Sequence, residues 1–116
     1  MYQNYEIVAV GEERPNQIRV DFTANVCKEN ETPCRVIVTQ DVVVTPSFIG
    51  TKPDEPYTWV WDFGDGTTKI SNETVQPVSH RYTMPGLYTV SLTGVKDDQS
   101  GTETKIGYIY VESKIN

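Results

Sequence analysis

Apolar and polar residues alternate, position by position, through most of the chain, which is the pattern of half-buried β-strands. The clearest early example runs from 17 to 26 and places its apolar residues on one face: Ile18, Val20, Phe22 and Ala24. The segment 87–95 repeats the pattern, with Tyr88, Val90 and Leu92 sharing a face. No window has apolar residues at helical spacing while avoiding Gly, Pro and β-branched runs, so we expect no helix.

Turn residues divide the chain into about seven to nine predicted strands. The predicted strands cover 5–10, 17–26, 35–44, 57–63, 67–70, 78–82, 87–95 and 102–111. The third has a candidate break near 40–41, and 47–49 is a candidate continuation of it. A tight Asp-Gly turn at 64–66 and a hairpin turn at 96–101 carry the residues that such turns favour. Short strands at regular spacing predict an all-β antiparallel sandwich.

Composition limits the chain to one modest domain and disfavours several partners. Of its 116 residues, 37% are hydrophobic and 22% charged, which suits a single small core. The net charge of -6 repels phosphate backbones and anionic lipids, so we expect no nucleic-acid partner. No apolar run approaches the roughly 20 residues of a membrane helix, so we expect no membrane insertion.

The first residues, Met1 to Glu6, have neither the basic nor the apolar region of a secretory signal. Two interpretations follow. The chain is either a piece of a longer exported protein, or a complete product that begins at Met1, as virion proteins made in a host cytoplasm do. We favour the second interpretation.

Cys27 and Cys34 are the only cysteines and flank a polar stretch rich in turn residues. A disulfide closing so short a loop is feasible and would stabilise the fold by about 2–3 kcal/mol in the entropic model. Two reduced thiols are the alternative, because the compartment decides the redox state. With two cysteines and one histidine, His80, we expect no structural zinc site.

Two motifs point to a known family. The first consists of Trp61, Asp62, Phe63, Gly64, Asp65 and Gly66, and the second of His80, Tyr82, Pro85, Gly86 and Tyr88, continuing to Val90 and Leu92. In this order and at this separation they resemble the PKD domain family, whose members are immunoglobulin-like β-sandwiches. The close match covers 57–111, and a looser one covers 20–24 and 33–44.

The resemblance divides the chain into a PKD-like β-sandwich at 17–116 and an added strand and turn at 1–16. The added strand, with Tyr5, Ile7, Val8 and Val10, is a candidate docking element, because an unpaired strand can join a partner's sheet. The sequence departs from the family in a longer stretch before Tyr57 and in its cysteine pair, which is not a family feature.

The resemblance implies framework roles for the motif residues. Trp61 is expected between the sheets, and Tyr88 as a tyrosine corner whose hydroxyl closes on nearby backbone. Gly64 and Gly66 permit turn dihedrals closed to other residues. His80, the only candidate general base, has no nucleophile in a recognisable motif with it, so we interpret it as structural and expect no enzyme.

The acidic residues of the turn also allow a metal interpretation. We favour Asp62 bonding turn amides or His80, with Asp65 setting the Asp-Gly turn. Calcium needs roughly six to eight oxygen ligands. A cage from distant residues would combine Asp97 and Asp98 with Asp41 or Asp54, but no spacing matches a known calcium loop. We therefore expect no cofactor and keep calcium as an alternative.

Aromatic residues could form a sugar-binding platform if they were exposed. The candidates are Tyr57, Trp59, Tyr82, Tyr108 and Tyr110. We favour burial, since Trp59 shares a face with Trp61 and strand aromatics commonly alternate into a core. Asn30 and Asn72 begin glycosylation sequons, which matter only in a glycosylating compartment.

These observations predict a non-catalytic structural or interaction module displayed on a virion or another extracellular surface. The favoured form is a phage capsid or tail decoration or accessory protein that binds other proteins. The alternatives are a PKD module of a cell-surface or S-layer adhesion protein and a polysaccharide-binding accessory module of a secreted hydrolase. Fold alone does not identify the partner.

Overall fold

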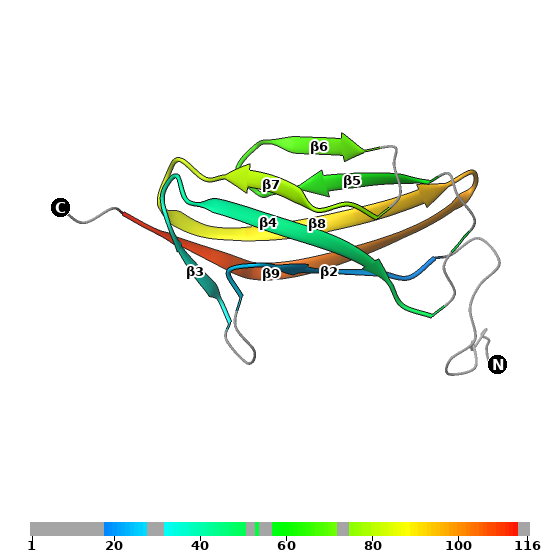
Figure 1. The fold of residues 1–116 in the computed structure, drawn as a ribbon, viewed down its shortest axis with the longest axis horizontal. Helices are drawn as coiled ribbons and strands as arrows, with labels where there is room; N and C mark the ends of the chain where they lie inside the picture. Colours follow the sequence, from blue (N-terminus) through cyan, green and yellow to red (C-terminus); the bar gives the residue numbers. More distant parts are fainter. Residues whose placement is uncertain (1–17, 28–31, 51–52, 54–56, 72–74, 114–116) are drawn as a thin grey trace, which may run out of the picture.

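The computed structural model describes residues 18–27, 32–50, 53, 57–71 and 75–113, which form eight strands (Figure 1). The strands are β2 (Val20–Ala24), β3 (Cys34–Ile37), β4 (Asp41–Phe48), β5 (Thr58–Asp62), β6 (Thr68–Ser71), β7 (Val78–Arg81), β8 (Gly86–Lys96) and β9 (Gln99–Glu112). Among these residues no helix is long and apolar enough to cross a membrane.

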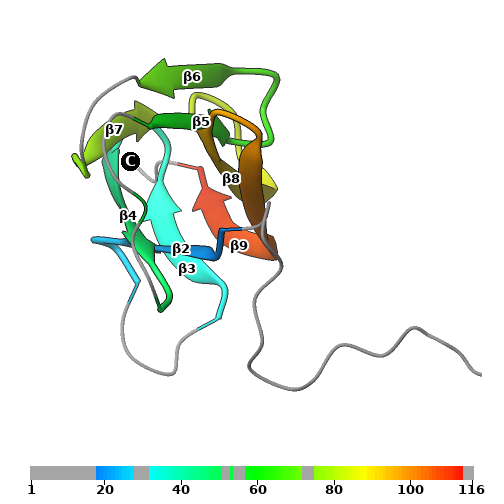
Figure 2. The ribbon, with the colours of Figure 1, turned by 90° about the vertical axis from the view of Figure 1, so that its right-hand side faces the viewer.

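The strands form two sheets that pack face to face as a sandwich. One sheet has the order β2-β4-β7 and the other the order β3-β9-β8-β5-β6. Figure 2 shows the two layers from one end, with β4 on one side and β8 and β9 on the other. The predicted all-β sandwich is therefore confirmed.

The core lies between the sheets and consists of the inward-facing residues of alternating strands. Trp59 and Trp61 on β5 are both buried, as the shared face predicted, and Phe22 and Leu92 meet them from β2 and β8. The apolar face predicted for the second strand is also buried in full. Large aromatic side chains supply much of this core, which suits a chain with modest apolar content.

The predicted third strand is two strands that belong to different sheets. β4 pairs antiparallel with β2 and β7, whereas β3 pairs in parallel with β9, where Cys34 lies opposite Ile109. The chain changes sheets between Ile37 and Asp41, and Thr39 adopts a positive φ of 69° there. Within the predicted antiparallel sandwich this β3–β9 pair is parallel, a detail that local alternation cannot show because it does not reveal the direction of a distant partner strand.

The β8–β9 hairpin is longer than predicted. Its turn consists of Asp97 and Asp98 alone, because Lys96 already pairs with Gln99. Asp97 has a φ of 53°, the conformation that tight hairpin turns require. The predicted turn at 96–101 is therefore mostly strand.

An irregularity interrupts the β8–β9 pairing between Tyr88 and Val90. Gly107 has a φ of 57° there, and its N–H donates a 3.1 Å hydrogen bond to Thr89 Oγ1. Beyond this bulge, Tyr108 packs its ring edge-on against Phe22, with centroids 5.6 Å apart. The bulge therefore re-aims β9 so that Tyr108 contributes to the contact between the sheets.

Cys27 and Cys34 form a disulfide. Cys34 is fully buried at the start of β3, and Cys27 follows β2, so the bond joins segments that continue into different sheets. The bond closes a short loop and is worth about 2–3 kcal/mol in the entropic model.

Candidate functional site

The two sequence motifs meet at one end of the sandwich. The β5–β6 turn, the end of β7 and the start of β8 all lie toward the same end of the molecule (Figure 1). The first motif supplies the turn, and the second supplies β7 and the bend that leads into β8. Residues far apart in the sequence therefore form a single cluster there.

A series of aromatic contacts connects this end to the core. Trp61 stacks on Phe63 with centroids 6.1 Å apart, and Phe63 stacks on the His80 ring at 4.1 Å. His80 in turn meets Tyr82 edge-on at 4.7 Å, and Tyr82 stacks on Tyr88 at 4.4 Å. The imidazole is thus held between two aromatic rings.

Asp65 covers the outer side of His80. His80 Nε2 lies 2.8 Å from Asp65 Oδ2, and both side chains are less than one-fifth exposed, at 14% and 18%. Asp65 Oδ1 also accepts hydrogen bonds from the backbone N–H and the hydroxyl of Thr67. Burial by itself would raise the pKa of Asp65, but the bonds from Thr67 and His80 outweigh it and lower the pKa below its usual range.

This geometry separates the roles of the two turn carboxylates. Asp62 Oδ1 accepts a 3.0 Å hydrogen bond from the N–H of Gly64, which is a turn amide. The partner of His80 is Asp65 and not Asp62, so that alternative of the prediction was wrong. The turn brings Asp65 back over β7, next to His80. Sequence spacing alone does not show whether Asp62 or Asp65 is the partner of His80.

Two tyrosine hydroxyls brace the same cluster. Tyr82 donates to the carbonyl of Phe63 at 2.7 Å, and Tyr88 donates to the carbonyl of Met84 at 2.7 Å. The second bond has the local geometry that the resemblance implies for a tyrosine corner. Burial raises the pKa of Tyr82 far above its ordinary value, so its hydroxyl keeps its proton and remains a donor.

The polar side chains of this cluster hydrogen-bond one another and are not arranged as a nucleophile with its base. The hydroxyl of Thr67 already donates to Asp65, and it approaches the same nitrogen of His80 that faces Asp65, at 3.4 Å. A catalytic histidine instead needs one nitrogen for the nucleophile and the other for an orienting group. These polar groups therefore satisfy one another.

The described residues contain no group of three or more His, Cys, Asp or Glu side chains that could hold a metal ion. Of the carboxylates considered for calcium, Asp41 accepts a hydrogen bond from Arg81, its cross-strand neighbour on β7. Asp97 and Asp98 belong to the β8–β9 turn, and Asp54 lies outside the described residues.

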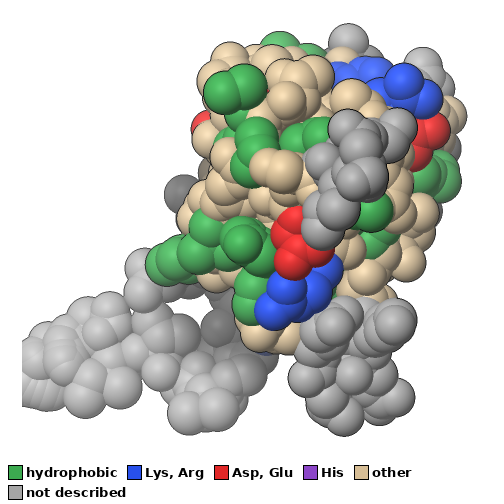
Figure 3. All heavy atoms as spheres, turned by 90° about the vertical axis from the view of Figure 1, so that its left-hand side faces the viewer, with side chains coloured by type: hydrophobic (Ala, Val, Ile, Leu, Met, Phe, Trp, Pro, Cys, Tyr) green, Lys and Arg blue, Asp and Glu red, His purple; other side chains and the backbone are tan. Residues whose placement is uncertain are grey.

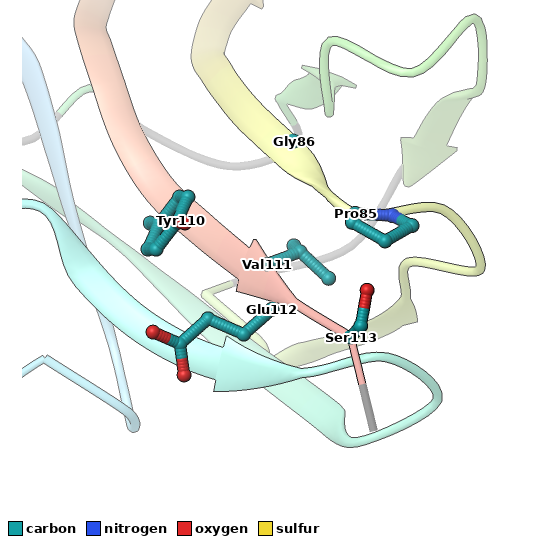
Figure 4. Close-up of a pocket in the computed structure, with 6 residues that line it drawn as sticks. All are labelled: Pro85, Gly86, Tyr110, Val111, Glu112 and Ser113. Atoms are coloured by element: carbon teal, nitrogen blue, oxygen red, sulfur yellow. The ribbon is translucent and has the colours of Figure 1, made fainter. Parts of the chain in front are cut away.

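Two open hollows lie at this end of the sandwich. One, of about 500 Å³, includes Asp65, His80 and Met84 in its lining. The other, of about 520 Å³, is lined by Pro85, Gly86, Tyr110, Val111, Glu112 and Ser113 (Figure 4). Figure 3 shows this end of the molecule with several apolar patches and acidic side chains next to basic ones.

The aromatic platform is largely absent, because most of its candidates are in the core. Tyr57, Trp59 and Tyr82 are buried, and Tyr108 is partly buried against the core. Tyr110 is the most exposed of the candidates, with 36% of its area exposed. A platform of several rings was therefore a wrong alternative, and the preferred interpretation of burial is confirmed for Trp59 and Trp61.

The sequence reasoning missed the charged pair beside Tyr110. The Arg35 guanidinium lies over the Tyr110 ring, 5.4 Å from its centroid, and its Nη1 is 2.6 Å from Glu112 Oε2. The parallel β3–β9 pairing creates this contact by placing Arg35 opposite Tyr110. Without that pairing, no signal in the sequence connects these residues.

Several predicted sites lie outside the described residues. These are the docking strand with Tyr5, Ile7, Val8 and Val10, and the sequon residues Asn30 and Asn72.

Comparison with protein families matches the PKD domain over residues 26–111. The chain belongs to the PKD domain family. The solution structure of the PKD domain from human VPS10 domain-containing receptor SorCS2 is similar, with a TM-score of 0.55 and 17% sequence identity, over 100% of this chain and 96% of that chain. At this identity the likeness concerns the fold. A search of curated proteins found no significant match.

The matched region includes the motif end of this PKD domain. There the aromatic series, the Asp65–His80 pair and the Tyr88 hydrogen bond connect the β5–β6 turn, β7 and the start of β8. PKD domains are generally non-catalytic interaction modules and are typically extracellular, and the disulfide is consistent with such a location. β2 precedes the matched region but pairs with β4, so the sandwich extends beyond the match.

Replacing Asp65 with asparagine is expected to lower stability at neutral pH by about 1–2 kcal/mol, because charge-assisted hydrogen bonds are lost. The pKa of Asp65 is lowered from its ordinary 3.8, so near that value the unfolded chain binds a proton that the folded chain excludes. The stabilisation is therefore present above this range and is lost as the pH falls through the lowered pKa.

Urea denaturation at a series of pH values from neutral to about pH 3 would measure the free energy of unfolding of the parent chain and of Asp65→Asn. The difference between the two should shrink on acidification. Asp97→Asn is a matched control, because the Asp97 side chain is 82% exposed. It should change stability little at any pH. A difference in the free energy of unfolding between Asp65→Asn and the parent that stays constant with pH would contradict the proposed role of the charge.

Proposed function

We propose that this PKD domain is a non-catalytic structural module that binds other proteins on an outer surface, as a virion decoration or accessory protein. The observation that carries the proposal is the closed network at the motif end. Asp65, His80 and Thr67 line an open hollow, but they bond one another and thereby stabilise the turn. The disulfide and the net charge of -6 suit a soluble module exposed to oxidising surroundings.

Mass spectrometry of purified virus particles and of washed host envelopes tests where the domain resides. Stoichiometric recovery of the intact chain in particles, beginning at Met1, supports a virion protein. Recovery only in envelopes, within a longer polypeptide, contradicts it and supports the adhesion or S-layer alternative. Absence of the chain from both the particles and the envelopes contradicts display on either surface.

Within this proposal, residues 1–16 are the attachment element. Deleting residues 1–12 should leave the sandwich folded, since every residue of the described core lies at Ile18 or beyond. The deletion should abolish attachment, because the predicted strand would no longer join a partner's sheet. Thermal unfolding would measure the fold, and co-sedimentation with the isolated partner surface would measure attachment.

A chain in which residues 5–10 are replaced by six Gly and Ser residues is the matched control for length. It should also fail to attach if the apolar strand is what binds. Attachment by the deleted chain, or its failure to fold, would remove the docking role of this segment.

The groove beside Tyr110 favours a second candidate, binding of a neutral polysaccharide. An exposed ring can stack on a sugar face, and the Arg35–Glu112 pair beside it offers donors and acceptors for hydroxyl groups. Pull-down with insoluble polysaccharides would test this candidate. Binding that is lost in Tyr110→Ala but kept in Met84→Ala supports it, and no binding by the parent chain rejects it.

A further inference from the structure

β6 is an edge strand of the larger sheet, and none of its residues is buried. It pairs with β5 on one side and, among the described residues, has no neighbouring strand on the other. Figures 1 and 2 both show it at the margin of the molecule. Its apolar residue, Ile70, is 64% exposed. An edge of this kind presents main-chain hydrogen-bonding groups to other proteins.

The pairing with β5 determines which main-chain groups of β6 point outward. The N–H of Phe63 donates to the carbonyl of Thr67 at 3.2 Å, which continues the β5–β6 register. Residue pairs of an antiparallel ladder alternate between hydrogen-bonded and non-hydrogen-bonded. Lys69 therefore bonds β5, whereas the N–H and C=O groups of Thr68 and Ile70 point away from it. We call these outward groups of Thr68 and Ile70 the β6 edge.

Two other edge strands carry caps on main-chain groups of this kind. On β3, the N–H of Ile37 donates to Gln40 Oε1 and its carbonyl accepts from the Gln40 N–H, both at 3.0 Å. On β2, the N–H of Phe22 donates to the Asp21 carboxylate at 2.7 Å. Within the described part of the chain, the β6 edge has no such cap. Its donors and acceptors are therefore available to an extended peptide, which carries the complementary groups at the same spacing.

Lys69 indicates the charge of the segment that would pair there. It lies in the middle of β6 and is exposed. Within the described residues it has no ion-pair partner, whereas Arg35 and Lys105 each contact a carboxylate, at 2.6 and 3.0 Å. A strand that pairs with the β6 edge places one residue directly opposite Lys69, with Cβ atoms about 4.5–5.5 Å apart. An acidic residue at that position would complement the Lys69 charge.

We propose that the β6 edge receives an extended segment of a partner protein, with an acidic residue opposite Lys69 and a β-branched residue on each side of it. The β-branched residues would lie beside Thr68 and Ile70 on the outer face of the sheet, where such side chains pack well. The inference rests on the proposed protein-binding function. It concerns a different part of the chain from residues 1–16, so either contact can fail without the other.

The same charge disfavours a second copy of this chain at the β6 edge. Two copies that paired edge to edge in antiparallel fashion would use all their outward groups only if Thr68 of each lay opposite Ile70 of the other. Lys69 would then lie directly opposite Lys69, and like charges at that position are destabilising. A lysine on an edge strand commonly prevents such self-pairing. The β6 edge therefore selects a partner that carries the opposite charge.

A nuclear magnetic resonance titration of the isotopically labelled full chain tests the proposal, with the peptide acetyl-STVEVTS-amide as the probe. The sequence of this peptide is symmetrical about its glutamate. In the free chain, the Thr68 and Ile70 amides should exchange quickly with solvent and the Lys69 amide slowly. The peptide should shift the Thr68 and Ile70 amide signals and slow their exchange. A single short peptide must be ordered on binding, so we expect millimolar affinity.

Charge reversal tests the role of Lys69. Lys69→Glu should weaken binding of the peptide by about 2- to 30-fold, because an attractive pair becomes a repulsive one. The peptide acetyl-STVKVTS-amide should show the opposite preference and bind Lys69→Glu better than the parent. Arg19→Glu is the control for net charge, since Arg19 is exposed just before β2 in the other sheet, and it should bind like the parent.

Ile70→Pro tests the main-chain contact. It removes one outward N–H and leaves the residues that bond β5 in place, and proline is tolerated at such edge positions. The variant should lose binding while circular dichroism shows the parent fold. No shift at Thr68 and Ile70, equal binding by Ile70→Pro, or equal binding of both peptides would overturn the proposal. Slow exchange of the Thr68 and Ile70 amides in the free chain would also overturn it, because the edge would already be occupied by this chain or by a second copy.

Discussion

Trp61→Ala is expected to lower the free energy of unfolding by about 3–5 kcal/mol. Trp61 has no exposed area, meets Phe22 edge-on at 5.3 Å and stacks on Phe63 at 6.1 Å. Truncation therefore removes a large apolar area and leaves a cavity between the sheets. Small domains have only about 5–15 kcal/mol in total, so the variant should be partly unfolded without stabilising conditions.

Urea denaturation followed by far-ultraviolet circular dichroism would measure this loss. Trp61→Phe keeps a ring in the same place and should lose clearly less. Met84→Ala is a surface control, because Met84 is 66% exposed, and it should change stability by about 0.5 kcal/mol or less. A loss of under about 1 kcal/mol for Trp61→Ala would contradict its position in the core.

Gly64→Ala should lower stability by roughly 3 kcal/mol or more, from two effects. Gly64 has a φ of 85°, where a side chain costs about 1–2 kcal/mol. An added Cβ would also lie 2.3 Å from the backbone carbonyl oxygen of Thr89, which cannot move without disturbing β8. Overpacking of this kind adds about 1–3 kcal/mol. Thermal and urea unfolding would measure the total.

Gly66→Ala separates the two effects within the same turn. Gly66 has a φ of 92°, but a Cβ there would meet nothing within 4 Å. This variant should therefore lose only the conformational part, about 1–2 kcal/mol. Equal losses in the two variants would show that close approach to Thr89 does not determine the requirement for glycine at position 64.

Sequence patterns predicted the strands and the core well where the information is local. Burial of Ile18, Val20 and Phe22 follows from alternation alone, because a sandwich strand has one face in the core. The transfer of β3 to the other sheet was not predictable in this way. β3 and β4 both alternate buried and less buried residues, and the parallel partner of β3 lies near the end of the chain.

The motif end was predictable as a framework but not in its contacts. The resemblance placed Tyr88 at a corner, and its hydroxyl reaches the Met84 carbonyl. Which aspartate meets His80 depends on how the turn folds back over β7, and the spacing of Asp62 and Asp65 leaves both open. Side-chain pairing across a turn depends on three-dimensional geometry, so the motif alone does not predict which aspartate contacts His80.

The parallel pairing of β3 with β9 also has a consequence for synthesis. Within the described part of the chain, β9 is the one hydrogen-bonded neighbour of β3, and β9 is also its last strand. While the ribosome is still adding residues, β3 has no neighbour in its sheet, and its apolar side chains Cys34 and Val36 have no completed core to enter. The sandwich therefore closes only after β9 has left the exit tunnel, and folding is late and dominated by non-local contacts.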